Sequence, residues 1–249
     1  MPSSVSDYVR ITRAPRYSLT FALPLLLLYE VLAFSLSGHD VVGVRNGADV
    51  LLKSLFIALG GRDGLIVFGA LLLGAGGWLV WRDWRGRSAE PRVFALMALE
   101  SIVYALVFGV VASTLTTLLL PGLAIQAPMS LVALHSEIQW SPLTQLMISL
   151  GAGIYEELLF RVLLVSGLAW LMGRIFHWRP TAAGVFAAIV GALVFSAFHY
   201  IGPYGDDLEL ASFTFRVVAG LLFSALYLIR GFGITAWTHA LYDVFLAFK

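Results

Sequence analysis

Long apolar runs alternate with short polar stretches along the whole chain. Seven runs are close to the ~20 residues that an α-helix needs to cross the hydrocarbon of a bilayer. They cover residues 17–37, 64–81, 93–119, 143–163, 181–200, 212–230 and 233–248. An unpaired backbone group is costly in lipid, and the runs lack the alternation of a transmembrane β-strand. Each run is therefore predicted to be a helix.

Two further segments are apolar without forming a clear span of their own. Residues 49–59 are too short to cross the membrane and are expected to lie at its interface. Residues 162–176 follow the fourth run with no break signal. This second segment either extends the fourth helix or forms a separate half-span. The predicted architecture is an all-α, polytopic transmembrane helical bundle of seven or eight spans.

Candidate chemistry is concentrated in the C-terminal part of the chain. Residues 1–142 hold the first three spans, at about 17–37, 64–81 and 93–119, and show no recognisable motif. Residues 143–249 hold all the motifs described below and form the candidate catalytic core. The two parts are expected to make a single membrane domain.

The composition supports a membrane protein and excludes several other classes. The chain is 59% hydrophobic and 12% charged, whereas soluble domains are about 45–50% apolar and about 25% charged. The net charge of +1 and the short arginine-rich loop at 82–92 indicate topology signals, with no nucleic-acid partner. The absence of cysteine excludes disulfides and thiolate chemistry. The first run is too long for a cleaved signal peptide and is taken as a span.

The distribution of Lys and Arg predicts the orientation in the cell membrane. With seven spans and a cytoplasmic N-terminus, ten Lys and Arg residues lie on the cytoplasmic side and four on the other side. Positive charge is enriched in cytoplasmic loops. The sequence therefore predicts a multi-pass protein with its N-terminus in the cytoplasm.

Three motifs place ionisable side chains inside the apolar segments. They are Glu156-Glu157-Leu-Leu-Phe-Arg161, Phe195-Ser-Ala-Phe-His199 and His239-Ala-Leu-Tyr-Asp243. Ionisable residues at membrane depth are rare, and they usually face a protein interior or a hydrated cavity. The three motifs together predict a buried polar site.

The two glutamates of the first motif are expected to have different tasks, because adjacent helical residues point about 100° apart. Glu157 and Arg161 are four residues apart with the acid first, which favours an ion pair. Glu156 is then left on a neighbouring face. A carboxylate in an apolar surrounding is suited to act as a general base. The alternative is that Glu157 and Arg161 only pin helices together, with Glu156 bordering a polar cavity.

His199 gains a catalytic interpretation through its possible carboxylate partner. A Glu–His pair can hold a water molecule and remove its proton. A straight helix rises about 1.5 Å per residue. From the cytoplasmic ends of their predicted spans, Glu156 and His239 therefore lie at a depth of roughly 10 Å, whereas His199 lies at roughly 27 Å. Either a helix is strongly tilted or broken, or the predicted boundaries are wrong.

His239 and Asp243 are four residues apart and share one helix face. Three roles fit this pair. The two residues could donate hydrogen bonds to a developing oxyanion, or Asp243 could fix the tautomer of His239. Alternatively, they could bind zinc together with Glu156 and His199. An ionised carboxylate only accepts hydrogen bonds, so Asp243 would have to be protonated in order to donate.

The ordered trio EExxxR, FxxxH and HxxxD on separate membrane helices resembles the CPBP family of intramembrane glutamic endopeptidases. That family includes Rce1-like CAAX prenyl proteases and bacteriocin-processing and immunity proteins. The resemblance covers about residues 143–248. It implies that Glu157 and Arg161 support the first motif.

The resemblance further implies a peptidase that needs no metal cofactor. Glu156 would activate water together with His199, and His239 and Asp243 would stabilise the tetrahedral oxyanion. The substrate would be a peptide or a membrane-anchored protein, prenylated in some members. The family often has Asn in place of Asp243, and this departure puts the donor role of that residue in question.

Three alternatives remain open from the sequence. The first is a zinc-dependent metalloprotease that uses Glu156, His199, His239 and Asp243 as ligands. The second is a proton-coupled transporter, since intramembrane Glu and His chains also carry protons. The third is a membrane scaffold or immunity protein that binds a partner without cutting it.

Three other charged residues, Glu30, Glu100 and Arg216, lie in or near spans and are expected to be structural. Arg216 is expected either to meet one of these two acids or to extend its side chain to the interface.

Overall fold

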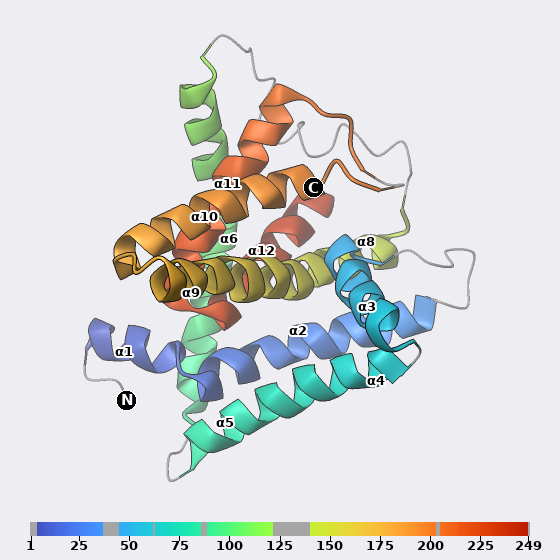
Figure 1. Ribbon diagram of the computed structural model, residues 1–249, viewed down its shortest axis with the longest axis vertical. Coiled ribbons are helices and arrows are strands. Elements are labelled where there is room, and N and C mark those ends of the chain that lie inside the picture. Colours follow the sequence, from blue (N-terminus) through green and yellow to red (C-terminus); the bar gives the residue numbers. More distant parts are fainter. Residues whose placement is uncertain are drawn as a thin grey trace.

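The computed structural model describes residues 4–36, 45–61, 63–85, 89–121, 140–202 and 205–248. These residues form helices and no strand (Figure 1). Six helices within them are long and apolar enough to cross a membrane: Pro15–Leu36, Asp63–Trp84, Pro91–Leu119, Pro142–Ile175, Pro180–Phe198 and Leu210–Arg230. Five of them match predicted runs to within three residues at either end. The prediction of an all-α multi-pass membrane bundle is confirmed.

The N-terminal part contributes two layers beside the central helices. Its elements are α1 (Val5–Thr12), α2 (Pro15–Leu36), α3 (Gly47–Gly60), α4 (Asp63–Ala70), η1 (Leu71–Ala75), α5 (Gly76–Trp84) and α6 (Pro91–Leu119). Helix α2 packs on α5 and on the C-terminal helices α8 (Pro142–Gly151) and α12 (Phe232–Ala247). Helix α3 packs against α4 and reaches the central helix at η2 (Figure 1).

The fourth span is longer than predicted. Helix α8 continues without a break into η2 (Ala152–Val165) and α9 (Ser166–Ile175), so that one helix of 34 residues crosses the middle of the molecule (Figure 1). Of the two possibilities for residues 162–176, extension of the fourth helix beyond residue 163 is confirmed, and a separate half-span is wrong. No proline interrupts the chain until Pro180 begins the next helix. Its middle part, η2, is wound as a π-helix, a geometry that often marks functional sites.

The last three helices pack around this long helix. Helix α10 (Pro180–Phe198) returns beside α9 and η2 and packs on α11 (Leu210–Arg230), and α12 packs against η2, α2, α6 and α8. With 16 residues, α12 is only about 24 Å long, less than the ~30 Å hydrocarbon core. The seventh predicted run is thus a short, largely buried helix, and seven to eight spans are not confirmed.

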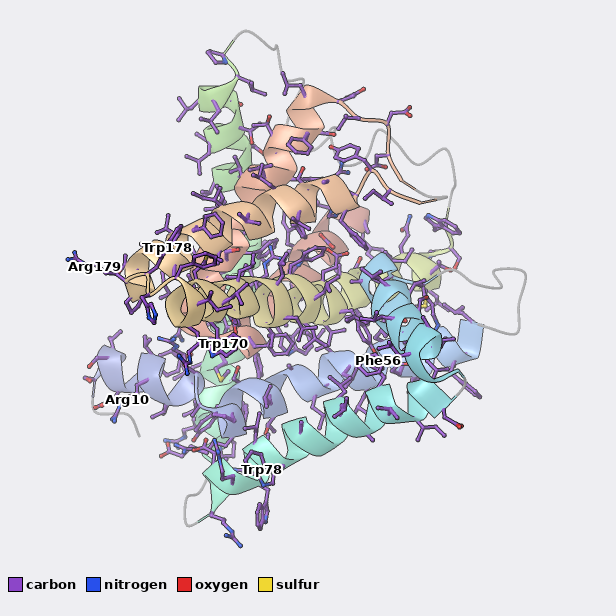
Figure 2. All side chains as sticks on the ribbon, viewed as in Figure 1. Arg10, Phe56, Trp78, Trp170, Trp178 and Arg179 are labelled. Carbon is purple, nitrogen blue, oxygen red and sulfur yellow. The ribbon has the colours of Figure 1, made fainter. Side chains whose placement is uncertain are left out.

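Buried side chains fill the centre, and the periphery is apolar. Tyr29, Met147 and Tyr155 are fully buried where α2, α8 and η2 meet. Large apolar side chains such as those of Trp78 and Trp170 are exposed on the outside (Figure 2). This is the arrangement expected of a protein whose surface contacts lipid. The buried polar side chains of η2 and α12 include Glu156, Glu157 and His239.

Candidate active site

The three polar motifs meet in space. Glu156 lies on η2, His199 directly follows α10, and His239 lies on α12. The imidazole Nε2 atoms of His199 and His239 are each 4.0 Å from Oε2 of Glu156. The predicted convergence of three helices on one polar site is therefore found in the structure, while the catalytic roles of these residues stay predictions.

His199 reaches the site because two antiparallel helices have matching lengths. Glu156 lies 19 residues before the end of α9 at Ile175, and His199 directly follows the 19 residues of α10. The chain turns back between Ile175 and Pro180, so both helices cover the same distance from that turn. The apparent 27 Å depth of His199 resulted from ending the fourth helix 12 residues too early.

The two oxygens of Glu156 have different surroundings. Oε1 accepts a hydrogen bond of 2.8 Å from Nδ2 of Asn46. Oε2 is buried and has no hydrogen-bond partner among the described residues. Oε2 is also the oxygen that faces both imidazoles. One oxygen of the carboxylate is therefore fixed by Asn46, and the other is free to accept a hydrogen bond.

The ring of His199 is oriented by the backbone of its own motif. Its Nδ1 lies 2.8 Å from the carbonyl oxygen of Phe195. A carbonyl only accepts hydrogen bonds, so Nδ1 carries the hydrogen and donates it. In the neutral ring, Nε2 then offers its lone pair toward Glu156. The ring of Phe195 also packs edge-on against that of His199, with centroids 4.8 Å apart.

The ring of His239 is held by Glu157 from the first motif. Its Nδ1 lies 2.7 Å from Oε1 of Glu157, and its Nε2 lies 3.7 Å from Oδ2 of Asp243. Of the three roles considered for Asp243, fixing the tautomer of His239 thus falls to Glu157 instead. The ring also stacks on Phe223 of α11, with centroids 4.2 Å apart.

The predicted ion pair between Glu157 and Arg161 is confirmed. Nη1 of Arg161 lies 3.1 Å from Oε1 of Glu157, and the two side chains are 1% and 0% exposed. The guanidinium group sits over the rings of Phe195 at 4.5 Å and Phe223 at 5.3 Å. Arg161 therefore fixes Glu157, which in turn fixes His239, in a surrounding of low polarity.

Among the described residues, the polar cluster is most exposed at His199 and Asp243. The side chains of His199 and Asp243 are 28% and 29% exposed, whereas those of Glu156 and His239 are 9% and 5% exposed. The cluster is therefore buried at Glu156 and His239 and partly exposed at His199 and Asp243.

Glu30, Glu100 and Arg216 each form an ion pair, as expected of structural residues. Glu30 lies 3.0 Å from Lys53, and Glu100 lies 2.7 Å from Arg230. Arg216 pairs with Asp206. The possibility that Arg216 meets Glu30 or Glu100 is wrong, because its partner is Asp206, in the segment just before α11. Its extension to the interface stays a prediction.

Asn46 was not identified from the sequence as a site residue. It lies in the polar stretch before α3 and caps that helix, with Oδ1 accepting from the backbone N–H of Ala48 at 2.9 Å. An Asn directly before an apolar segment is a signal for a helix cap. No sequence signal links this cap to Glu156, which is 110 residues away in the chain.

Two further observations concern alternative sites. Within the described residues, no group of three or more His, Asp or Glu side chains has an arrangement suited to a metal ion.

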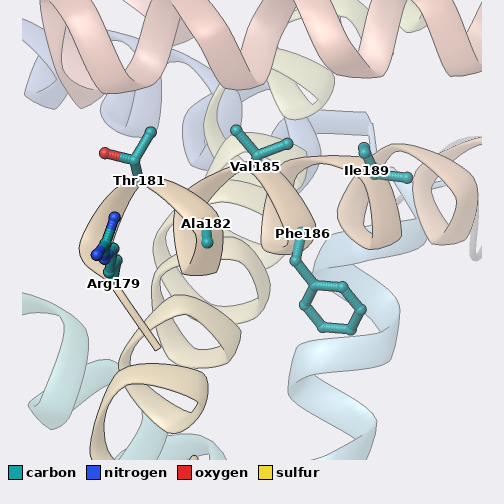
Figure 3. Close-up of a pocket in the computed structure, with 6 residues that line it drawn as sticks. All are labelled: Arg179, Thr181, Ala182, Val185, Phe186 and Ile189. Carbon is teal, nitrogen blue, oxygen red and sulfur yellow. The ribbon is translucent and has the colours of Figure 1, made fainter. Parts of the chain in front are cut away.

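A surface groove of about 640 Å³ lies along α10 and is lined by Arg179, Thr181, Ala182, Val185, Phe186 and Ile189 (Figure 3). It shares no residue with the polar cluster, so it is separate from the candidate active site.

Comparison with known proteins supports the family resemblance. Residues 138–245 match the family model described as type II CAAX prenyl endopeptidase Rce1-like. The matched segment is somewhat less than half of the chain and contains all three motifs. The predicted resemblance to the CAAX protease family is confirmed. Comparisons with curated proteins and with solved structures gave no match.

Proposed function

We propose that this protein is an intramembrane endopeptidase that hydrolyses a peptide bond of a membrane-associated or prenylated protein. The match of residues 138–245 to a CAAX endopeptidase family supports protease activity. The observation that carries the mechanism is the state of Glu156. One of its oxygens is held by Asn46, and the other is buried, unpaired and directed at two imidazoles.

Glu156 and His199 are arranged to hold a nucleophilic water molecule. Their facing atoms are 4.0 Å apart, too far for a direct hydrogen bond. A water oxygen beside the line between them reaches both at about 2.8 Å. Its two hydrogens then point to Oε2 of Glu156 and Nε2 of His199, and a lone pair is free to attack the scissile carbonyl carbon.

Proton transfer through Glu156 balances the reaction. As the water oxygen bonds to the carbonyl carbon, Glu156 takes one proton from it. The tetrahedral intermediate then collapses, the C–N bond breaks, and Glu156 returns that proton to the leaving nitrogen. The products are a carboxylic acid and an amine, and the site is restored.

His239 is placed to stabilise the oxyanion. Its Nδ1 donates to Glu157, and Glu157 and Asp243 surround the ring with negative charge. An imidazolium in this position carries a second hydrogen on Nε2, which faces the site and can donate to the developing oxyanion. When Asp243 is ionised, it accepts and does not donate hydrogen bonds, so it contributes by stabilising the imidazolium.

Cleavage of a prenylated peptide tests the proposal. Purified protein in lipid nanodiscs is given an internally quenched, farnesylated CAAX peptide and the same peptide without the lipid. We expect the wild-type protein to cleave the farnesylated peptide and His199→Ala to lose about 10²–10⁴-fold in kcat. Wild-type activity in folded His199→Ala would contradict the proposal that Glu156 and His199 together activate the water molecule.

A chelator experiment separates this mechanism from a metalloprotease. The water-activation scheme needs no metal, so activity is expected to persist in a strong chelator. Loss of activity that zinc restores would instead support Glu156, His199, His239 and Asp243 as metal ligands.

A comparison of membrane proteomes extends the test to natural substrates. Cells with wild-type protein are compared with cells that carry Glu156→Gln. We expect uncut membrane-associated proteins to accumulate in the variant. Identical proteomes, together with proton flux through the reconstituted protein, would favour a transporter.

A further inference from the structure

We propose that Asn46, which lies outside the segment matched by the family model, is a positioning residue of the active site. Its amide holds one oxygen of Glu156 so that the other oxygen is presented to water. This inference rests on the proposed function, because it gives Asn46 a part in the work of Glu156. It also makes the N-terminal part of the chain a component of the site.

The contact is short, buried and directional. Nδ2 of Asn46 donates to Oε1 of Glu156 at 2.8 Å, and Asn46 is 4% exposed. The other end of the same amide, Oδ1, accepts from the N–H of Ala48. Because the helix cap requires the oxygen at that end, the nitrogen must face Glu156. The amide therefore cannot flip without losing both hydrogen bonds.

A network of hydrogen bonds and ion pairs fixes Asn46 in turn. Its backbone N–H donates to the hydroxyl of Tyr29 at 3.3 Å, and that hydroxyl donates to Asp49 at 2.7 Å. Asp49 is fully buried and pairs with Arg45 at 2.8 Å and Lys53 at 2.6 Å. The start of α3 is thus anchored before it reaches Glu156.

Gly151 allows the close approach between this anchored loop and the long central helix. A Cβ atom at Gly151 would lie 2.6 Å from Cβ of Asn46 and 2.6 Å from a ring carbon of Tyr29. Real Cβ atoms essentially never come so close. Any larger residue, five positions before Glu156, would push Asn46 away from the carboxylate.

The chemical effect is that the two carboxylate oxygens of Glu156 have different functions. A hydrogen bond to a charged group is stronger than one between neutral groups, and it fixes the plane of the carboxylate. With Oε1 held by Asn46, Oε2 is directed at His199 and His239. Misplacing a reacting group by about 1 Å can lower the rate by about 10²-fold.

Two substitutions separate this role from helix capping. Asn46→Ser and Asn46→Asp both keep a good N-cap for α3, but neither presents an amide donor to Glu156. On the farnesylated peptide we expect kcat to fall by about 10- to 100-fold with KM little changed. Ser141→Ala is the matched control, because it removes the cap of α8 and does not touch Glu156. It should lower the melting temperature and leave kcat within twofold.

A stability measurement tests the contact without relying on activity. Asn46→Ser lowers the melting temperature partly through the lost bond to Glu156. We expect this decrease to be at least halved in a Glu156→Ala background, where the bond is already absent. Equal decreases in both backgrounds would overturn the inference.

The activities of these variants distinguish a failure of the positioning role of Asn46 from a failure of the proposed function. If Glu156→Gln is inactive while Asn46→Ser and Asn46→Asp keep kcat within twofold, the positioning role is wrong and the proposed function stands. If folded Glu156→Gln retains wild-type cleavage, the proposed mechanism through Glu156 fails, and the positioning role of Asn46 fails with it. If the wild-type protein cleaves no peptide, the proposed function itself fails.

Discussion

Glu100, which is partly buried, and Glu156, which is buried, are two carboxylates with opposite surroundings. Glu100 on α6 forms a two-point contact with Arg230 of α11, at 2.5 and 2.7 Å, and accepts from the hydroxyl of Tyr8 at 2.9 Å. Glu156 has one oxygen held and the other 4.0 Å from two imidazoles. A carboxylate with both oxygens bound links helices, whereas one with a single free oxygen facing imidazoles can accept a proton.

The same contrast separates the neighbouring residues Glu156 and Glu157. Glu157 also has an oxygen, Oε2, without a hydrogen-bond partner among the described residues. Its other oxygen, however, binds both Arg161 and His239, and the whole side chain is buried. An unpaired oxygen is therefore not enough to indicate catalysis, and the partners that it faces decide its role.

Neutralising Glu157 is expected to have the largest effect on stability and to lower activity as well. Glu157→Gln leaves Arg161 as an unpaired buried charge and weakens the hold on His239. Breaking a buried ion pair costs about 3–5 kcal/mol of stability. Thermal unfolding in nanodiscs measures the loss, and peptide cleavage should fall as well. If the variant is as stable as the wild type, Glu157 does not link η2 to α12 in the way described.

Neutralising Glu100 is expected to change stability alone. Glu100→Gln weakens the contact between α6, α11 and α1, and hydrogen bonds to charged groups are worth about 1.5–3 kcal/mol. The melting temperature should fall, while kcat of the folded variant should stay near that of the wild type. A large loss of kcat without a change in melting temperature would remove the distinction between the two kinds of carboxylate.

Filling the space at Gly151 is expected to have a smaller effect, confined to activity and local packing. Gly151→Ala displaces Asn46 and should lower kcat about three- to tenfold, less than a full misplacement of about 1 Å. Gly167→Ala on the same long helix is the control, because a Cβ there meets no atom within 4 Å. Equal kcat values for the two variants would show that the close approach at Gly151 does not serve Glu156.

The apolar runs and the three motifs were predictable because they depend on local properties of the sequence. Hydrophobic length gave the positions of five spans, and four-residue spacing gave the Glu157–Arg161 pair. The sequence left the end of the fourth helix open, because residues 162–176 carry no break signal. Measuring the depth of Glu156 from residue 163 made His199 seem too distant from it.

Contacts between distant segments were less predictable. The four-residue spacing suggested that Asp243 orients His239, yet Glu157 is 1.0 Å nearer to the ring, at 2.7 Å against 3.7 Å. Which carboxylate meets the ring depends on how η2 and α12 are rotated about their axes. Asn46 was missed for the same reason, since its capping role is local but its contact with Glu156 is not.

The central claim is that Glu156 removes a proton from the attacking water. The most direct measurement is kcat of Glu156→Gln on a peptide that the wild-type protein cleaves, in strong chelator, with the melting temperature as a check of folding. Gln keeps the shape of the side chain and cannot accept the proton. We expect a loss of at least about 10²-fold at an unchanged melting temperature. A kcat within a few-fold of the wild-type value would contradict the account.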